Sequence, residues 1–265
     1  MPAAKASQKP TTKSQRPVGI MRQDLYQELY DLEKDYWWHV GKRSLVEKLI
    51  QKYLRPGKNR QLVDVGCGSG LMMEILKKYG EPHGVDLTEE ALKFCRQRGL
   101  KNLYQADVTK LPFKKDQVDL VIALDLIEHV ADDVAAFREF HRVVKPGGII
   151  VISVPAFKFL WSYWDDILGH ERRYTARSLA TAITKAGFKV EKVGYSNSLI
   201  LLPTFLMRKL KSLKKIDPEE QPSDFIPTPR ALNKLLTSYY ALETSAAANI
   251  RLPAGLSVIA VARKT

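Results

Sequence analysis

Val63-Asp-Val-Gly-Cys-Gly-Ser-Gly70 is the stretch that decides the fold of this 265-residue chain. A short apolar segment, residues 61–65, runs directly into closely spaced glycines, and residues 71–78 continue with a helical pattern. A strand that turns through such a loop into a helix directs backbone amides toward the carboxyl end of the strand, where ligands bind in open α/β sheets. Glycines alone would also suit a tight turn, so the acids beside the loop decide what it holds.

Two acidic residues accompany this loop. Asp64 lies just before it, and Asp86 ends the next predicted strand, where an acid bonds ribose hydroxyls in such sheets. Leu71 stands where a dinucleotide-binding loop has glycine or alanine, and residues 61–76 contain no lysine or arginine to face a pyrophosphate. A carboxylate favours the cationic groups of S-adenosylmethionine (SAM). The sequence therefore predicts SAM as the cofactor.

Strands and helices alternate along most of the chain. The predicted strands are residues 61–65, 84–87, 102–105, 118–123, 149–154, 188–193 and 256–262. The predicted helices lie within residues 23–53, 71–78, 89–98, 131–144 and 177–186, with a turn at 146–148 and a loop at 218–229. This alternation predicts an α/β fold with a doubly wound, mostly parallel sheet.

Five segments resemble the motifs of class I SAM-dependent methyltransferases. They are the glycine loop at residues 63–70, the strand end at 84–87, and residues 106–113, 119–130 and 142–148. The resemblance, which spans residues 61–193, implies a Rossmann-like seven-stranded sheet whose last strand is antiparallel. The SAM-binding residues that it implies are Arg43, Asp64, Gly66, Cys67, Gly68, Gly70, Asp86, Leu87, Asp107, Val108 and Leu124.

An aromatic cluster, Tyr36-Trp-Trp-His39, precedes Arg43 and resembles a lid helix of many bacterial members of this family. The resemblance implies that the aromatic rings cover the cofactor and that Arg43 meets its carboxylate. Packing in the core for Trp38 and solvation for Arg43 are the alternatives.

Histidines after the fourth and fifth predicted strands are candidates for the chemistry. Methyl transfer depends on orientation, and an oxygen or carbon acceptor often needs a base as well. His129, His170 and Tyr174 are the predicted catalytic residues, and residues 169–174 resemble a segment of quinone-pathway O-methyltransferases. The alternative is a structural role, with His170 bonded to the backbone and the adjacent arginines paired with acids.

Asp125, Glu128 and His129 have the spacing that brings side chains together on one helical turn. Quinone-pathway enzymes carry two acids and a histidine here, some of them are thought to use a divalent cation, and carboxylates suit Mg²⁺. We favour the alternative, in which Glu128 and His129 orient the cofactor loop or cap the next helix. No metal site is therefore predicted, and these three residues remain the only Mg²⁺ candidates.

The resulting domain boundaries are a disordered basic tail (1–20), N-terminal lid helices (21–57), the SAM-binding core (58–195), a helical insert (196–255) and the last strand (256–265). Two cysteines without ligand spacing favour a reducing compartment such as the cytoplasm. The formal charge of +13 indicates either an anionic partner or simply a lysine-rich surface.

The insert contains an apolar run, residues 199–207, followed by basic residues from Arg208 to Lys215. The run is too short to span a bilayer. Two interpretations fit it: a substrate lid that contacts an anionic membrane surface peripherally, or a buried helix paired with residues 231–248.

The predicted function is methyl transfer from SAM to an oxygen or carbon of a small or lipid-like acceptor. RNA modification is an alternative suggested by the charge. Nucleic acid is nevertheless a disfavoured partner, because residues 123–126 lack the Pro-Pro-aromatic motif of amino-group methylation and the chain has no Pro-Cys pair. A third alternative is a non-catalytic methyltransferase-like binding protein, against which the intact acids and glycines of the loop argue.

Overall fold

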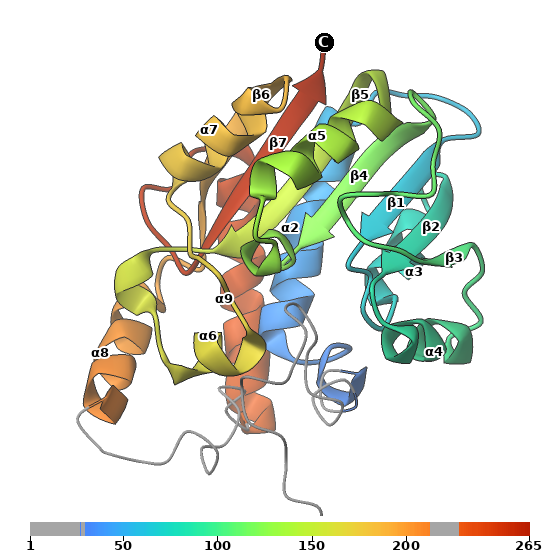
Figure 1. The fold of residues 1–265 in the computed structure, drawn as a ribbon. Helices are drawn as coiled ribbons and strands as arrows, with labels where there is room; N and C mark the ends of the chain where they lie inside the picture. The colour runs from blue at the N-terminus through green and yellow to red at the C-terminus, as the bar shows by residue number, and fades with distance from the viewer. Residues whose placement is uncertain (1–26, 28–29, 213–227) are drawn as a thin grey trace, which may run out of the picture.

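The computed structural model describes residues 27, 30–212 and 228–265 (Figure 1). The predicted tail, part of the predicted first helix and most of the predicted loop at 218–229 lie outside the described residues. The strands of the sheet are β1 (Gln61–Val65), β2 (Glu81–Asp86), β3 (Leu103–Gln105), β4 (Val118–Leu124), β5 (Val144–Pro155), β6 (Phe188–Ser196) and β7 (Ser257–Lys264). Together they form one seven-stranded sheet in the order β3-β2-β1-β4-β5-β7-β6.

The strand directions confirm the predicted fold. β1 pairs in parallel with β2 and β4, and β4 pairs in parallel with β5. β7 is antiparallel to both β5 and β6. The chain order reverses between β1 and β4, and ligands of open α/β sheets bind beyond the carboxyl ends of the strands at such a point.

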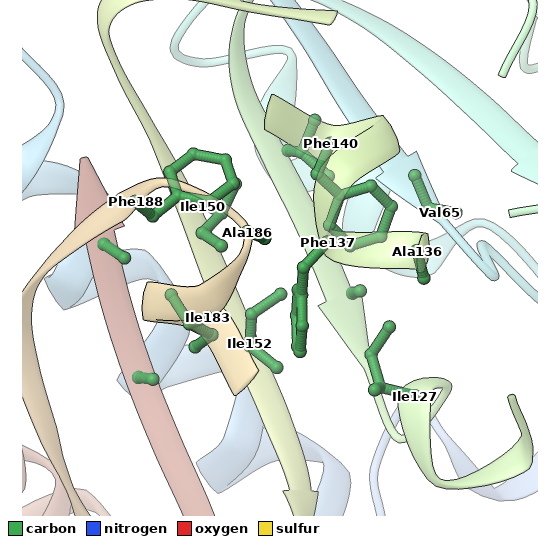
Figure 2. Packing of buried hydrophobic residues seen from close by; sticks show 14 of the residues in the cluster. Val65, Ile127, Ala136, Phe137, Phe140, Ile150, Ile152, Ile183, Ala186 and Phe188 are labelled. Atoms are coloured by element: carbon green, nitrogen blue, oxygen red, sulfur yellow. The ribbon is translucent and has the colours of Figure 1, made fainter. Parts of the chain in front are cut away.

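Helices cover both faces of this sheet. They are α2 (Trp37–Tyr53), α3 (Leu71–Leu76), α4 (Glu89–Gln97), α5 (Asp133–Val143), α6 (Tyr163–Leu168), α7 (Ala176–Lys185), α8 (Leu201–Ser212) and α9 (Arg230–Asn249). α5 and α7 pack on one face, where Phe137, Phe140 and Ile183 are fully buried against β5 (Figure 2). α2 and α9 cover the other face (Figure 1). Burial on both faces explains the continuous apolar pattern of the central strands.

Two local features differ from the sequence prediction. The predicted turn at residues 146–148 is part of a longer β5, which begins at Val144 and pairs with β4 through a register shift. Gly147 there has a φ of 80°, a conformation that an L side chain rarely adopts. Helix α6 was not predicted: it begins with a capping box between Ser162 and Asp165 and ends at Gly169, whose φ is 73°.

The packing of α2 against α9 depends on a glycine. A Cβ placed on Gly41 would lie 1.8 Å from Cδ1 of the fully buried Tyr240. We expect Gly41→Ala to lower the free energy of unfolding by about 1–3 kcal/mol, because neither helix can yield without disturbing the core. Chemical denaturation measures this. The matched control is Gly57→Ala, whose Cβ would meet only the flexible side chain of Arg60; equal losses in both variants would contradict the expectation.

Candidate active site

The glycine loop is held to the end of β2 by backbone and carboxylate bonds. The amides of Gly66 and Cys67 donate to the carbonyl of Val85. The amide of Gly68 donates to Oδ2 of Asp86 at 3.1 Å. Gly68 has a φ of 51°, and a Cβ there would meet no atom within 4 Å, so the space beside the loop is open. The loop therefore presents backbone to an open volume, as ligand binding requires.

Asp86 is also fixed from its other side. Its Oδ1 accepts hydrogen bonds of 3.0 Å from both the amide and the hydroxyl of Thr88. Burial raises the pKa of this carboxyl, and the bonds from Thr88 and Gly68 partly oppose that effect. The carboxylate is thus held rigidly at the strand end, where it can accept further bonds from hydroxyl groups.

Asp64 is a buried acid in the wall of the same site. Burial, and then the negative charges of Asp86 and Glu33, raise its pKa to about 8. No ion pair reaches Asp64 from any residue that the structure describes. A buried carboxylate without a countercharge is costly, so this position is suited to a ligand that brings a positive charge.

A cavity of about 780 Å³ joins these groups, a volume in the range of small-molecule sites. Its wall contains ten of the eleven predicted cofactor-binding residues: Arg43, Asp64, Gly66, Cys67, Gly68, Asp86, Leu87, Asp107, Val108 and Leu124. Gly70 is not in the wall. A Cβ on Gly70 would approach Leu100 and Cys95, so this glycine permits the loop to pack closely on α4.

The N-terminal segment closes one side of the cavity. Trp37 and Trp38 both line it, and the buried Trp37 also packs edge to face on Tyr240 of α9. Arg43 lies in the wall, but its guanidinium donates to the backbone carbonyls of Glu33 and Lys34. The neighbouring Lys42, which the sequence analysis missed, is buried in the wall and pairs with Asp125.

Glu33 anchors this segment to the glycine loop. Its Oε1 accepts from the hydroxyl of Ser69 and from the guanidinium of Arg98. Sequence spacing gave no indication of this contact, because the three residues belong to separate elements.

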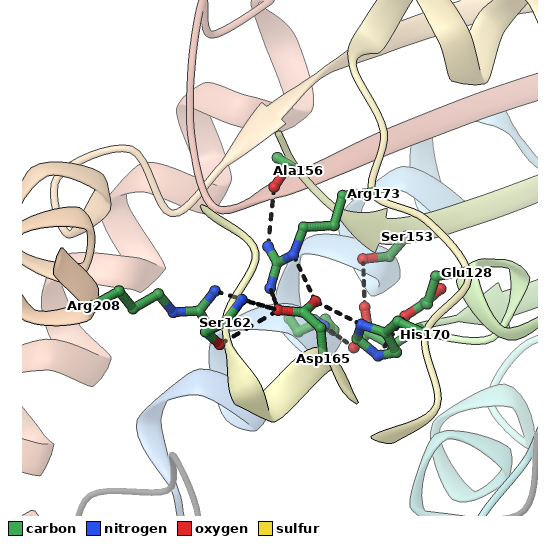
Figure 3. A network of polar contacts seen from close by, with 10 residues as sticks. Glu128, Ser153, Ala156, Ser162, Asp165, His170, Arg173 and Arg208 are labelled. Atoms are coloured by element: carbon green, nitrogen blue, oxygen red, sulfur yellow. Dashed lines mark hydrogen bonds and ion pairs between the residues drawn. The ribbon is translucent and has the colours of Figure 1, made fainter. Parts of the chain in front are cut away.

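Two histidines line the same cavity as the glycine loop. His170 and His129 both line the cavity, with ring centroids 4.7 Å apart. Nδ1 of His170 is 2.8 Å from Oδ1 of Asp165, which is fully buried (Figure 3). Burial and then the positive charge of His170 lower the pKa of His129 to about 4. His129 is therefore a neutral imidazole at physiological pH.

Asp165 is also held by Arg173. Nε and Nη2 of Arg173 donate to its two oxygens at 2.6 and 3.0 Å. Burial acts to raise the pKa of Asp165, but the hydrogen bonds from His170 and Arg173 outweigh it and place the pKa below its usual range. An ionised Asp165 only accepts hydrogen bonds, so Nδ1 of His170 is the donor. Nε2 is then free to accept a proton when the ring is neutral.

Tyr174 does not line the cavity, unlike the two histidines predicted with it. It is buried, and its hydroxyl donates to Oδ2 of Asp133 at 2.8 Å. Burial and this hydrogen bond to an acid raise the pKa of the phenol. The geometry supports a structural role for Tyr174, which ties the residue before α7 to the start of α5.

The side chains also define what can be placed beside the histidines. Leu126, Trp164, Leu168 and Met207 contribute apolar wall here, and Arg208 of α8 reaches to 3.9 Å from Oδ2 of Asp165. None of these five residues was predicted as a site residue. The sequence signals for them were the segment after the fourth predicted strand, the polar-aromatic stretch before His170 and the insert after β6.

Comparison with known proteins agrees with this geometry. Residues 63–152 match the model of the methyltransferase domain. These residues therefore belong to the methyltransferase domain family. The chain is 31% identical over 153 residues to the ubiquinone biosynthesis O-methyltransferase of Coxiella burnetii. The match covers 53% of this chain and 65% of that protein, so less than two thirds of the curated relative is spanned.

Solved structures show the same fold at lower identity. A chain from the complex of the Haloferax volcanii Trm112 methyltransferase activator with a putative methyltransferase superposes with a TM-score of 0.59 at 19% identity. The superposition covers 91% of this chain and 93% of that one. A putative methyltransferase from Bacillus halodurans has a TM-score of 0.56 at 21% identity, with 83% of this chain and 98% of that one covered.

The fold brings together a different set of possible metal ligands from the one considered in the sequence. Ligand atoms of Glu128, His129 and His170 lie within 4.8 Å of one another, whereas Asp125 is engaged by Lys42. Burial and then the charge of Asp125 raise the pKa of Glu128 well above its usual value. One buried carboxyl and two imidazoles are a poor match for Mg²⁺, which takes a shell of oxygens. The predicted trio of Asp125, Glu128 and His129 is therefore not assembled as a magnesium site.

None of the helices in the described part of the chain is long and apolar enough to cross a membrane.

Proposed function

We propose that this methyltransferase transfers a methyl group from SAM to an oxygen or carbon atom of a small or lipid-like acceptor. The observation that carries the proposal is that one cavity is lined both by the cofactor-type acids at the ends of β1 and β2 and by His170, whose ring is hydrogen-bonded to Asp165. The name of the curated relative, an O-methyltransferase of ubiquinone biosynthesis, supports an oxygen acceptor.

The residues present fit SAM. Asp86 and the amides of the glycine loop suit the ribose and the carboxylate, and Asp64 offers a buried negative charge to the ammonium group. Asp107 stands at the rim, where its carboxylate accepts from the amide and hydroxyl of Thr109. When bound, SAM supplies an electrophilic methyl group on a sulfonium centre.

The chain's own contribution is orientation and proton removal. The apolar wall formed by Trp38, Leu126, Trp164 and Met207 excludes water and holds a flat or aliphatic acceptor. His170 is positioned by Asp165, so that Nε2 takes the proton that an acceptor hydroxyl loses as it becomes methylated. The resulting imidazolium is stabilised by the ionised Asp165.

Two measurements test the proposal. Calorimetry should show SAM binding to the full chain, and labelled SAM incubated with cell extracts should label small or lipid-soluble molecules. A folded protein with no affinity for SAM would sink the assignment. Label appearing in RNA rather than in the organic extract would overturn the class of acceptor.

The two acids that meet SAM should differ in importance. We expect Asp86→Ala to weaken SAM binding roughly ten- to a hundredfold, since charge-assisted bonds are lost and Gly68 and Thr88 lose their anchor. Asp107→Ala should cost less, because Asp107 is exposed at the rim. Calorimetric titration of both variants decides, and equal losses would contradict the ranking.

A further inference from the structure

Helix α8 has an inner face that lines the cavity and an outer face that carries exposed leucines. Thr204 and Met207 lie on the inner face and line the cavity. Leu202, Leu206 and Leu210 lie on the opposite face and are 64, 52 and 67% exposed. Their spacing of four residues places them in one stripe along the helix. A helix at a protein surface normally turns its polar side to water, whereas α8 turns a row of leucines outward.

The stripe belongs to a larger apolar surface. Leu199, just before α8, is 62% exposed, and Phe159 is 58% exposed. The Phe159 ring packs edge to face on Phe205 of α8, with centroids 5.7 Å apart, which joins it to the helix. We call the surface formed by Phe159, Leu199, Leu202, Leu206 and Leu210 the outer patch. In Figure 1, α8 lies at the outer edge of the molecule, away from the sheet. All five side chains are more than half exposed, so no described segment covers the outer patch. Contiguous exposed apolar surface of this kind marks an interaction site.

The exposure of the α8 leucines also bears on the two interpretations of the insert, a membrane-contacting lid or a buried helix paired with residues 231–248. α9, the expected partner of α8, packs along α2 instead. The hydrogen bonds that the described residues make here to α9 come from the segment just before α8: the amide of Leu199 donates to the hydroxyl of Tyr239, and the amide of Ser198 donates to Glu243. α8 is therefore a surface helix and not a buried core helix.

Two described lysines border the outer patch. Lys158 and Lys209 are exposed at its borders, and Nζ of Lys209 lies 6.0 Å from the centroid of the Phe205 ring. The sequence of α8 also contains Arg208 and Lys211 but no aspartate or glutamate. Apolar side chains flanked by cations complement an interface of acyl chains and anionic headgroups. An apolar protein partner would require the leucines but not this charge.

We propose that the outer patch docks on an anionic lipid bilayer and so places the mouth of the cavity at the membrane surface. The link to catalysis rests on the proposed function: the helix that meets the lipid also forms cavity wall, and its Arg208 bonds the carbonyl of Leu160 and approaches Asp165. An apolar acceptor can then pass from the bilayer to His170 along the inner face of α8 without entering bulk water.

Sedimentation of the full chain with vesicles tests the docking. The vesicles contain phosphatidylcholine alone or mixed with phosphatidylglycerol, at low salt and at about 0.5 M salt, where surface attraction is screened. We expect binding to the mixed vesicles at low salt, weaker binding at high salt, and more than about a tenfold loss of partitioning in the Leu206→Asp/Leu210→Asp double variant. The matched control is Leu242→Asp/Ile250→Asp, which adds the same two charges at positions of and just beyond α9 that are 75 and 58% exposed; it should bind like the parent.

Several outcomes overturn the docking. One is that the parent stays in the supernatant with mixed vesicles. Another is that the double variant binds like the parent, or that the control loses binding as the double variant is expected to. Size-exclusion chromatography that shows a dimer, lost in the double variant, without vesicle binding would assign the outer patch to a second copy of the chain. If the aspartates unfold the protein, Leu206→Ser/Leu210→Ser repeats the comparison.

SAM titration of each protein keeps the two proposals apart. Intact SAM affinity without vesicle binding rejects the docking alone. Vesicle binding without SAM affinity rejects only the cofactor assignment.

Discussion

Replacing His170 with alanine is expected to lower kcat by about a hundred- to ten-thousandfold, the usual contribution of a general base, while SAM affinity changes by no more than about twofold. The reason is the position of the ring. Its Nδ1 is bound to the ionised Asp165, its Nε2 lies 4.0 Å from Oε1 of Glu128, and the residue lines the cavity. Proton removal is lost in the variant, whereas the groups that suit the cofactor remain.

Tyr174→Phe is the matched control for this variant. Tyr174 lies in the same stretch of chain, but its hydroxyl bonds Asp133 outside the cavity. Removing it should cost about 1 kcal/mol of stability and leave turnover near that of the parent. Steady-state kinetics and SAM calorimetry on both proteins check the pair. A His170 variant that loses SAM affinity as strongly as turnover would show that the residue serves the cofactor and not the acceptor.

Asp165→Asn separates positioning from a purely structural contribution. An amide can still occupy the site beside Arg173, but it can no longer stabilise an imidazolium at His170. We therefore expect kcat to fall with a changed pH profile and an unchanged KM for SAM. A structural role alone would lower the melting temperature without altering the pH profile of the remaining activity.

The sheet and the cofactor-type half of the site were predictable because their determinants are local. Strand β1, the glycine loop and Asp86 form a continuous pattern in which each residue type is dictated by backbone geometry or by the edge of the sheet. The cap of α7 by Thr175, which accepts from the amide of Ser178, was likewise visible from sequence. Patterns of this range need no knowledge of tertiary packing.

The acceptor half was less predictable because it is built from distant segments. Lys42 and Asp125, which pair across the cavity wall, are separated by 83 positions in the chain. Tyr174 and His170 looked equivalent in sequence, yet a bridge between Ala156 and Tyr174 turns the tyrosine into the core. Helix α6 did leave a local signal, since Ser162 and Asp165 have capping-box spacing and Gly169 follows as the end of the helix.

Asp64→Asn is expected to weaken SAM binding by more than about a hundredfold and, at the same time, to raise the melting temperature of the ligand-free protein by a few degrees, since the folded parent must hold a proton on this buried acid that the unfolded chain releases. The raised pKa, about 8, means that folded Asp64 keeps a proton between its ordinary value of 3.8 and pH 8, whereas the unfolded chain releases it. Stability from this group is therefore present at low pH and is lost as pH rises through 8. Asparagine has no charge to lose, so the variant should not show this decline.

Thermal melts of parent and variant between pH 5.5 and 9 measure the difference, which should widen as the pH rises toward 8, the pKa of folded Asp64, and stay constant above it. SAM binding to the parent below pH 8 should also release a proton, because a cationic partner favours the ionised carboxylate. Calorimetry in buffers of different ionisation enthalpy detects that release. Asp107→Asn is the matched control: it removes a carboxylate from the exposed rim of the same cavity and should show neither the gain in stability nor the pH effect. Parallel melting curves for the parent and Asp64→Asn across this range, or unchanged SAM affinity in Asp64→Asn, would refute the role of Asp64 as the buried countercharge of the cofactor.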